Sequence, residues 1–260
     1  MLKHRVIPLL SLDNYKLIKT RCFKDPQYVG DPLNAIHIFN EKEVDEIIII
    51  DITASKEKRE PNFNLIEEIA GECYMPLTYG GGIRSIEDVD RILSMGVEKV
   101  SLQSSVIMNR NFINDLALRF GSQSIVVSVD VKKNLLGKAQ YLFSSKNLIL
   151  QTDLIDLIKD LVNAGAGEVL LNSVDKDGTL SGPDLDMIKK ISNSIDVSVI
   201  ACGGISSLDD IKAAVEVGAS AVAAGSFFVY YGPHRAVLIS YPKYNELEQL
   251  FSNLNKIPNE

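Results

Sequence analysis

Residues 79–88 read YGGGIRSIED and residues 201–210 read ACGGISSLDD, so a glycine-rich turn followed by a helix start occurs twice in this chain. The two Gly-Gly-Ile segments are 122 residues apart. One such match arises easily by chance, but a fixed offset that also places helix starts in register indicates that the second half of the chain repeats the first. Other pairs at the same offset are Glu46 and Glu168, Ile86 and Leu208, Asp88 and Asp210, and Ser104 and Ser226.

Short runs rich in Val, Ile and Leu recur along the chain, which is typical of buried parallel strands. The segments between them, such as 64–73, 86–95 and 208–217, carry apolar residues at helical spacing. Eight βα units close a barrel, so the sequence predicts an α/β fold, a single (β/α)8 TIM barrel built from two similar half-barrels, over 1–254. A polar tail would follow at 255–260. The predicted strands are 5–12, 46–51, 75–79, 99–103, 124–130, 168–172, 197–201 and 221–224.

Composition and charge exclude several functional classes. The 260 residues, 46% of them hydrophobic, provide the core of one barrel rather than of two smaller domains. The net charge of -7 would repel a nucleic-acid backbone, and no Lys/Arg run offsets it. The apolar start contains Pro8 and lacks a cleavage site, and no later run reaches the roughly 20 apolar residues that span a bilayer. We therefore expect a cytoplasmic protein that binds neither nucleic acid nor membranes.

The cysteines and histidines predict no disulfide framework, no metal site and no cofactor, because they are scattered without CxxC, HxH or HExxH spacing. No Ser/His/Asp or Cys/His nucleophile pattern is visible either. Hydrolysis that needs such a nucleophile, for example of glutamine, would therefore have to come from another chain. The residues concerned are Cys22, Cys73, Cys202, His4, His37 and His234.

Glycine loops and hydroxyls follow several predicted strands, at the end where such barrels carry their chemistry. Backbone N–H groups of glycine loops bind phosphate well, so each half offers one candidate phosphate site, although tight turns alone would also explain either loop. The duplication favours two sites facing each other across the mouth. They comprise Gly81, Gly82 and Ser104 in the first half, Gly203, Gly204, Gly225 and Ser226 in the second, and Asp177 and Gly178 in a polar loop that would touch substrate.

Asp51 and Asp130 each follow an apolar run directly and should stand at this same face. A carboxylate there acts as a general acid or base if burial raises its pKa. Either aspartate could instead cap the next helix or pair with a basic loop residue.

Four charged residues open strands at the opposite end of the barrel, where apolar or capping residues are usual. Two bases and two acids could form a closed ionic ring. The ring would either stabilise the barrel floor or act as a gate for a small neutral molecule such as ammonia. The four residues are Arg5, Glu46, Lys99 and Glu168.

Over nearly its whole length the chain resembles the cyclase subunit of imidazole glycerol phosphate synthase, the HisF family. The Asp-Ile-Thr-Ala-Ser run at 51–55 is specific to that subunit, whereas the sister isomerase of the pathway shares only the half-barrel duplication. The other shared motifs are GDP at 30–32, GGGI at 80–83, FGSQ at 120–123, DGT at 177–179 with SG at 181–182, and GG at 203–204.

The resemblance implies one half of a glutamine amidotransferase. A HisH-like glutaminase would dock on the barrel floor as a heterodimer partner, and ammonia would cross the core to a small phosphorylated substrate at the mouth. Arg5, Glu46, Lys99 and Glu168 fall on the family's gate positions, Glu98 on an acidic position used for signalling to the glutaminase, and Lys19 on a functional lysine of the mobile first loop.

The chain departs from the family at the mouth. The family's acid/base pair is two aspartates; Asp130 matches the second, but the first position is Ser11, with Asp13 as a conceivable substitute two residues on. The stretch 143–150 also lacks the family's Gly/Thr phosphate pattern. A retained floor with an altered mouth favours a paralogue that supplies ammonia to a sugar amidotransferase forming acetamidino sugars of surface polysaccharides. The alternatives are a genuine histidine-pathway cyclase, and a non-catalytic conduit that activates the glutaminase and passes ammonia on.

Overall fold

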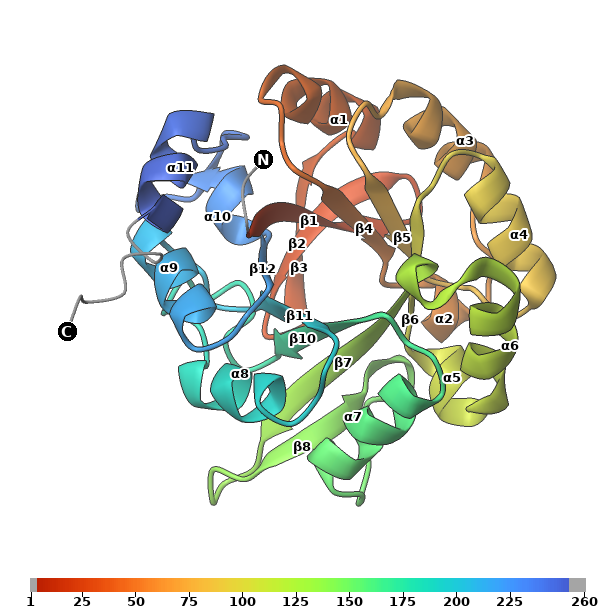
Figure 1. Cartoon of the computed structure of the whole chain (residues 1–260). Helices are drawn as coiled ribbons and strands as arrows, with labels where there is room; N and C mark the ends of the chain where they lie inside the picture. The colour runs from red at the N-terminus through yellow and green to blue at the C-terminus, as the bar shows by residue number, and fades with distance from the viewer. Residues whose placement is uncertain (1–3, 253–260) are drawn as a thin grey trace.

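The computed structural model describes residues 4–252, so the predicted boundary after residue 254 and the tail at 255–260 lie outside the described residues. Within that range eight parallel strands pair in chain order, and the last pairs with the first to close a barrel (Figure 1). The predicted (β/α)8 fold is confirmed. The barrel strands are β1 (Arg5–Asp13), β4 (Ile47–Asp51), β5 (Leu77–Gly80), β6 (Lys99–Leu102), β7 (Ile125–Lys133), β10 (Glu168–Ser173), β11 (Ser198–Cys202) and β12 (Ala221–Ala224).

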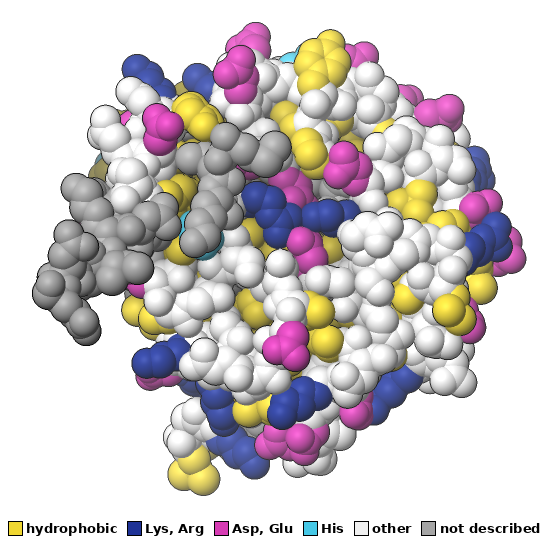
Figure 2. Space-filling view, in the orientation of Figure 1, with side chains coloured by type: hydrophobic (Ala, Val, Ile, Leu, Met, Phe, Trp, Pro, Cys, Tyr) yellow, Lys and Arg dark blue, Asp and Glu magenta, His cyan; other side chains and the backbone are white. Residues whose placement is uncertain are grey.

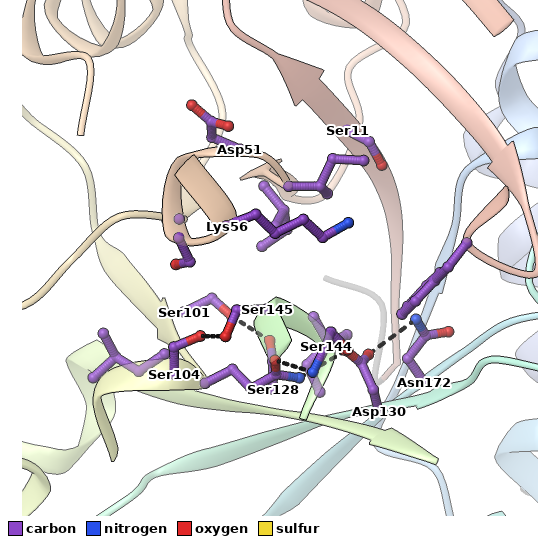
Figure 3. Close-up of a pocket in the computed structure, with 18 of the residues that line it drawn as sticks. Ser11, Asp51, Lys56, Ser101, Ser104, Ser128, Asp130, Ser144, Ser145 and Asn172 are labelled. Atoms are coloured by element: carbon purple, nitrogen blue, oxygen red, sulfur yellow. Dashed lines mark hydrogen bonds between the residues drawn. The ribbon is translucent and has the colours of Figure 1, made fainter. Parts of the chain in front are cut away.

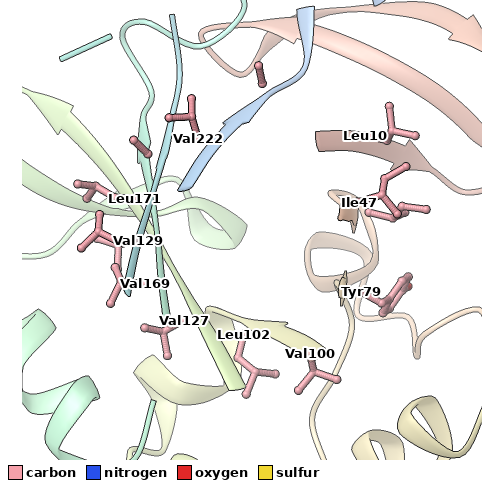
Figure 4. Close-up of a cluster of buried hydrophobic side chains, with 14 of the residues drawn as sticks. Leu10, Ile47, Tyr79, Val100, Leu102, Val127, Val129, Val169, Leu171 and Val222 are labelled. Atoms are coloured by element: carbon pink, nitrogen blue, oxygen red, sulfur yellow. The ribbon is translucent and has the colours of Figure 1, made fainter. Parts of the chain in front are cut away.

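Helices surround the barrel and cover the outward faces of its strands (Figure 1). Outward-pointing residues such as Val127, Val129 and Leu171 are fully buried beneath them (Figure 4). Burial of each such side chain contributes about 1.5–3 kcal/mol, so this layer holds the barrel together. The longer helices are α1 (Pro32–Glu41), α3 (Phe63–Glu72), α4 (Ile86–Ser94), α6 (Asn111–Phe120), α7 (Leu154–Asn163), α8 (Leu185–Ser192), α9 (Leu208–Glu216) and α11 (Tyr244–Ser252).

The two halves repeat each other in detail. Helices α4 and α9 begin and end 122 residues apart, as do the starts of the short helices α5 (Ser104–Met108) and α10 (Ser226–Val229). Helices α4 and α9 both begin with a serine cap. The Ser85 hydroxyl accepts from the Asp88 N–H at 3.1 Å, and the Ser207 hydroxyl accepts from the Asp210 N–H at 3.2 Å. A serine cap satisfies a backbone donor that the first helical turn leaves unpaired.

The structure contains elements that the sequence did not predict. In each half, extra antiparallel strands follow the first barrel strand: β2 (Lys16–Arg21) with β3 (Lys24–Gly30), and β8 (Ala139–Phe143) with β9 (Leu148–Ile149). The predicted strand at 75–79 begins only at Leu77, because the preceding Pro76 has no N–H to donate to a ladder. The remaining elements are α2 (Ala54–Glu57), the 3-10 turns Ser122–Ser124 and Ser144–Lys146, β13 (Tyr230–Tyr231) and β14 (Ala236–Val237).

Inside the barrel, polar groups lie above and below an apolar layer. Strand residues alternate between the inner and outer face, so Arg5, Glu46 and Glu168 are followed two residues later by the apolar Ile7, Ile48 and Leu170. This inner cluster is separate from the core beneath the helices. Its buried residues are Ile7, Ile48, Val126, Leu170, Ile200, Cys202, Ala221 and Ala223.

No helix within residues 4–252 is long and apolar enough to cross a membrane. The same residues contain no group of three or more His, Cys, Asp or Glu side chains that could hold a metal ion.

Candidate active site at the barrel mouth

A pocket opens at the carboxyl ends of the barrel strands, where the sequence places the chemistry. Figure 3 shows Ser11 and Asp51 on one side of it and Asp130, Ser144 and Asn172 on the other. The cavity reaches down to Leu9, Ile50 and Leu170 of the barrel interior. The mouth therefore communicates with the inner apolar layer.

Asp130 ends the inward-facing run of β7 and is buried. Its carboxylate accepts hydrogen bonds from the side-chain amides of Gln103 at 2.7 Å and Asn172 at 3.3 Å, and from the Ser144 hydroxyl. Burial raises the pKa of Asp130, and the three hydrogen bonds partly oppose that rise. The group is thus suited to hold or transfer a proton at the mouth.

Ser11 lies on β1 and lines the pocket opposite Asp130 (Figure 3). Among residues 4–252 its hydroxyl has no hydrogen-bond partner. An unactivated hydroxyl does not act as a general base near neutral pH, so of the two facing positions Ser11 and Asp130 only Asp130 offers a carboxylate. Asp13 does not replace it, because this residue lies outside the pocket and accepts a 3.2 Å hydrogen bond from Asn14.

Asp51 also lines the pocket, but its carboxylate is already engaged. Oδ1 accepts from the N–H groups of Thr53 at 3.0 Å and Ala54 at 2.9 Å, which caps the start of α2. Oδ2 pairs with the Arg59 guanidinium at 3.3 Å. Asp51 therefore makes both contacts that the sequence predicts as an alternative to catalysis: it caps the next helix and pairs with a basic loop residue. Because it also lines the pocket, it would lie next to a bound ligand.

The second half carries a compact cradle at the ends of β11 and β12. Its glycines sit against backbone so closely that a Cβ on Gly203 would lie 2.6 Å from the Ser173 carbonyl oxygen, and one on Gly204 would lie 2.2 Å from that of Gly182. The Ser226 hydroxyl is buried and has no hydrogen-bond partner within residues 4–252. Bare N–H groups and an unsatisfied hydroxyl suit the oxygens of a phosphate. The cradle also contains Asp177, Gly178, Leu180, Cys202, Ile205, Ala224 and Gly225.

The corresponding residues of the first half line the large pocket, and some of their polar groups already form hydrogen bonds within the protein. Gly81 and Gly82 line it, and the Gly82 N–H donates to the Ser55 hydroxyl at 3.3 Å. The Ser104 hydroxyl donates to the Ser145 hydroxyl at 2.8 Å. The two predicted phosphate sites are thus unequal in this structure.

Lys19 and Asp177 lie between the two regions. Burial lowers the pKa of Lys19, and the nearby carboxylate of Asp177 partly offsets this. Burial likewise raises the pKa of Asp177 to about 6, and Lys19 opposes the rise. The Lys19 ammonium donates to the Leu9 carbonyl at 2.6 Å and fills the space beside Gly225, where a Cβ would lie 2.0 Å from it.

At the opposite end of the barrel the four predicted residues meet in a closed ring. The Arg5 guanidinium contacts Glu46 at 2.5 Å and Glu168 at 2.7 Å, and the Lys99 ammonium contacts the same carboxylates at 3.4 Å and 3.0 Å. Burial opposes the charge on Arg5, yet the two glutamates raise its pKa above the ordinary value. Figure 2 shows basic and acidic side chains gathered at the centre of this face. The neighbouring Glu98 is exposed.

Sequence reasoning missed several pocket residues. Gln103, Ser144 and Asn172 were not singled out, although Gln103 ends a predicted strand next to Ser104. Lys56 and Arg59 follow the strand that ends at Asp51 and belong to the turn that this aspartate organises. A polar residue one position before or a few positions after each strand end would have been the available signal.

Comparisons with known proteins show the family of the chain. The histidine biosynthesis protein family matches residues 5–234. A Pseudomonas aeruginosa protein named "Putative imidazole glycerol phosphate synthase subunit hisF2" is 48% identical over 95% of this chain and 99% of its own length. The imidazole glycerol phosphate synthase subunit HisF of Streptococcus sanguinis is 38% identical over 89% of this chain and 92% of its own. The chain therefore belongs to the histidine biosynthesis protein family and is a HisF-like member of it.

Proposed function

We propose that this chain is the ammonia-using subunit of a two-chain glutamine amidotransferase, with a HisH-like glutaminase docked on the barrel floor. The observation that carries the proposal is the closed ring of Arg5, Lys99, Glu46 and Glu168 beneath a barrel interior that leads to the pocket of Asp130. A structural plug would explain the ring alone, but not its alignment with a reactive mouth.

The interior chemistry suits NH3 rather than NH4+. Ile7, Ile48 and Leu170 form an apolar layer between ring and pocket, where an unpaired charge would be strongly disfavoured. A small neutral molecule crosses such a layer once side chains shift slightly. The ring would have to open first, and a docked partner that competes for one of its charges would provide the means.

At the mouth we propose an acceptor other than the ribonucleotide of histidine biosynthesis. Ser11 replaces one carboxylate of the expected acid/base pair, so the cyclisation chemistry lacks a base. We favour a sugar as the acceptor. The ammonia would pass to a sugar amidotransferase that forms acetamidino sugars of surface polysaccharides. The numbered names hisF2 and hisF3 of two relatives that are 48% identical fit such a paralogue.

Two assays on the purified chain test these statements. With its cognate HisH-like glutaminase, the chain should form a heterodimer and raise the rate of glutamine hydrolysis, and Lys99→Met should change that rate while Lys212→Met on the outer helix α9 should not. Absence of a complex and of any stimulation would overturn the assignment.

With ammonium salt and the ribonucleotide substrate of the family, the parent chain should form no imidazole product, whereas Ser11→Asp should gain measurable turnover. If the parent already turns over the ribonucleotide, it is a histidine-pathway cyclase. If ammonia is released at the mouth but no sugar amidotransferase uses it, the conduit alternative replaces the paralogue.

A further inference from the structure

Lys56 occupies a position in the pocket that the proposed function does not yet use. The residue lies in the first turn of α2, and Figure 3 shows its side chain extending into the cavity between the wall of Ser11 and the wall of Asp130. Among the described residues that line this pocket it is the only lysine or arginine. Within residues 4–252 its ammonium makes no hydrogen bond or ion pair.

The turn that carries Lys56 is held firmly. The Asp51 carboxylate caps it, and Arg59 bonds both Asp51 at 3.3 Å and the Thr53 hydroxyl at 2.7 Å. On its other side the Ser55 hydroxyl accepts from the Gly82 N–H. The backbone beneath Lys56 is therefore fixed, which places its ammonium at the mouth.

Among the described residues no carboxylate forms an ion pair with this ammonium, although its charge is the weakest of the influences that oppose the raised pKa of Asp130. The Asp51 carboxylate is paired with Arg59, and that of Asp130 accepts hydrogen bonds from three other donors. Ser11 adds no charge at the position where the family has an aspartate. An anionic ligand would meet an attractive cation and one fewer repelling carboxylate here.

We propose that Lys56 binds an anionic group of the acceptor, a carboxylate or a phosphate, beside the position where ammonia reacts. This inference rests on the proposed function and narrows its substrate class: the acceptor carries an anion at the Lys56 side of the pocket, in addition to any phosphate held by the Gly203 to Ser226 cradle. The pairing of a cation with the uncharged Ser11 sets this mouth apart from one built for a two-aspartate mechanism.

The test uses backbone amide shifts of the full, 15N-labelled chain, titrated separately with inorganic phosphate and with acetate. In the parent, the amides of Ser55, Gly82 and Gln103 should shift with at least one of the two anions. In Lys56→Gln the affinity read from these shifts should fall about tenfold, the loss of one charge-assisted hydrogen bond. Which anion gives the response identifies the acceptor's group.

Lys58→Gln is the matched control, since this exposed lysine leaves α2 two residues later and lies outside the pocket. It should bind like the parent. The phosphate response of the Gly204 and Ser226 amides should be equal in all three proteins, which also shows that Lys56→Gln is folded. A mouth response that is absent in the parent, or unchanged in Lys56→Gln, overturns the inference.

The proposed function fails separately. A chain that binds anions through Lys56 but does not stimulate a glutaminase would retain the site and lose the amidotransferase assignment. Conversely, a Lys56→Gln chain that still stimulates the glutaminase, with its anion response unchanged, would retain the assignment and lose the site.

Discussion

The first and second half-barrels place the same serine cap at the start of α4 and α9 but end in different mouths. Ser85 and Ser207 cap α4 and α9 through the same contact, whereas the hydroxyl of Ser104 is bonded to Ser145 and that of Ser226 is buried without a partner in the described chain. Helix caps serve the scaffold, so any change there costs stability in either half. The residues at the mouth line pockets instead, so they can differ between the halves without breaking a helix start.

The largest expected difference between the halves lies in the ring. The Glu46 side chain is 3% exposed and accepts from Arg5, Lys99 and Thr78, while Glu168 is 12% exposed and, among residues 4–252, accepts from the two bases only. Removing a buried partner leaves uncompensated charge, so Glu46→Ala should lower the free energy of unfolding by about 4 kcal/mol, and Glu168→Ala by about 2 kcal/mol. Urea denaturation measures both. Equal losses for the two variants would contradict the difference between the two glutamates. The control Glu98→Ala, which changes an exposed residue next to the ring, should alter the free energy of unfolding by less than about 0.5 kcal/mol.

The next difference concerns Asp177, whose counterpart at the 122-residue offset is the uncharged Ser55. Burial raises the pKa of Asp177 from 3.8 to about 6, so the folded state binds its proton more tightly than the unfolded state does. The resulting stability is complete below about pH 4 and is lost as pH rises through about 6, a loss of about 3 kcal/mol.

Asp177→Asn should remove that loss, and the parent-minus-variant difference in unfolding free energy between pH 4 and 7.5 measures it. The hydrogen bond from Thr20 can persist in this variant, because the asparagine oxygen still accepts. A difference that does not vary with pH would show that the carboxyl group is not buried as described.

A smaller effect separates the two phosphate sites. Ser226→Ala removes an unpaired hydroxyl from the cradle and should weaken binding of inorganic phosphate there about tenfold. Ser104→Ala removes a hydroxyl already bonded to Ser145 and should change phosphate binding by less than about threefold. Calorimetric titration of each variant compares them. Equal losses would mean that the halves bind phosphate alike.

The smallest expected effect concerns the serine caps of α4 and α9, which the two halves share. Ser85→Ala and Ser207→Ala should each lower the free energy of unfolding by about 1 kcal/mol, because each removes one N-cap hydrogen bond. Thermal denaturation of the two variants should give losses within a few tenths of a kcal/mol of each other. Clearly different losses for the two variants would show that the two caps have the same geometry but contribute differently to stability.

Local signals explain what the sequence could predict. The pairs Asp88 with Asp210 and Ser104 with Ser226 mark helix starts, which depend on neighbouring residues and so keep the offset visible. Four charges at strand starts predicted a ring because parallel strands place their starts at one end. The hairpin of β2 and β3 was missed, because β3 contains Pro26 and is largely exposed and polar.

The altered site was harder to predict, since its contacts join distant elements. Asp130 receives hydrogen bonds from residues of three different βα units, and their nearness to strand ends does not by itself show which of them reach the same carboxylate. The position of Lys56 depends on contacts that the sequence does not show: Asp51 bonds Arg59, and within residues 4–252 no carboxylate of the pocket wall pairs with the lysine ammonium in its place. Ser11, in contrast, was singled out by the resemblance to the family, because it stands where the family has its first aspartate.

The closure of β1 against β12 also bears on how the chain is made. Strand β1 is synthesised before the other seven barrel strands, yet one of its neighbours, Ala221–Ala224, is the last of the eight, and Arg5 can pair with Glu168 only after β10 has been made. Until then the growing chain exposes unpaired strand edges, which favour aggregation and slow, non-local folding. Truncated or stalled chains should therefore depend on chaperones, and no partial product that lacks Glu168 could close the ring.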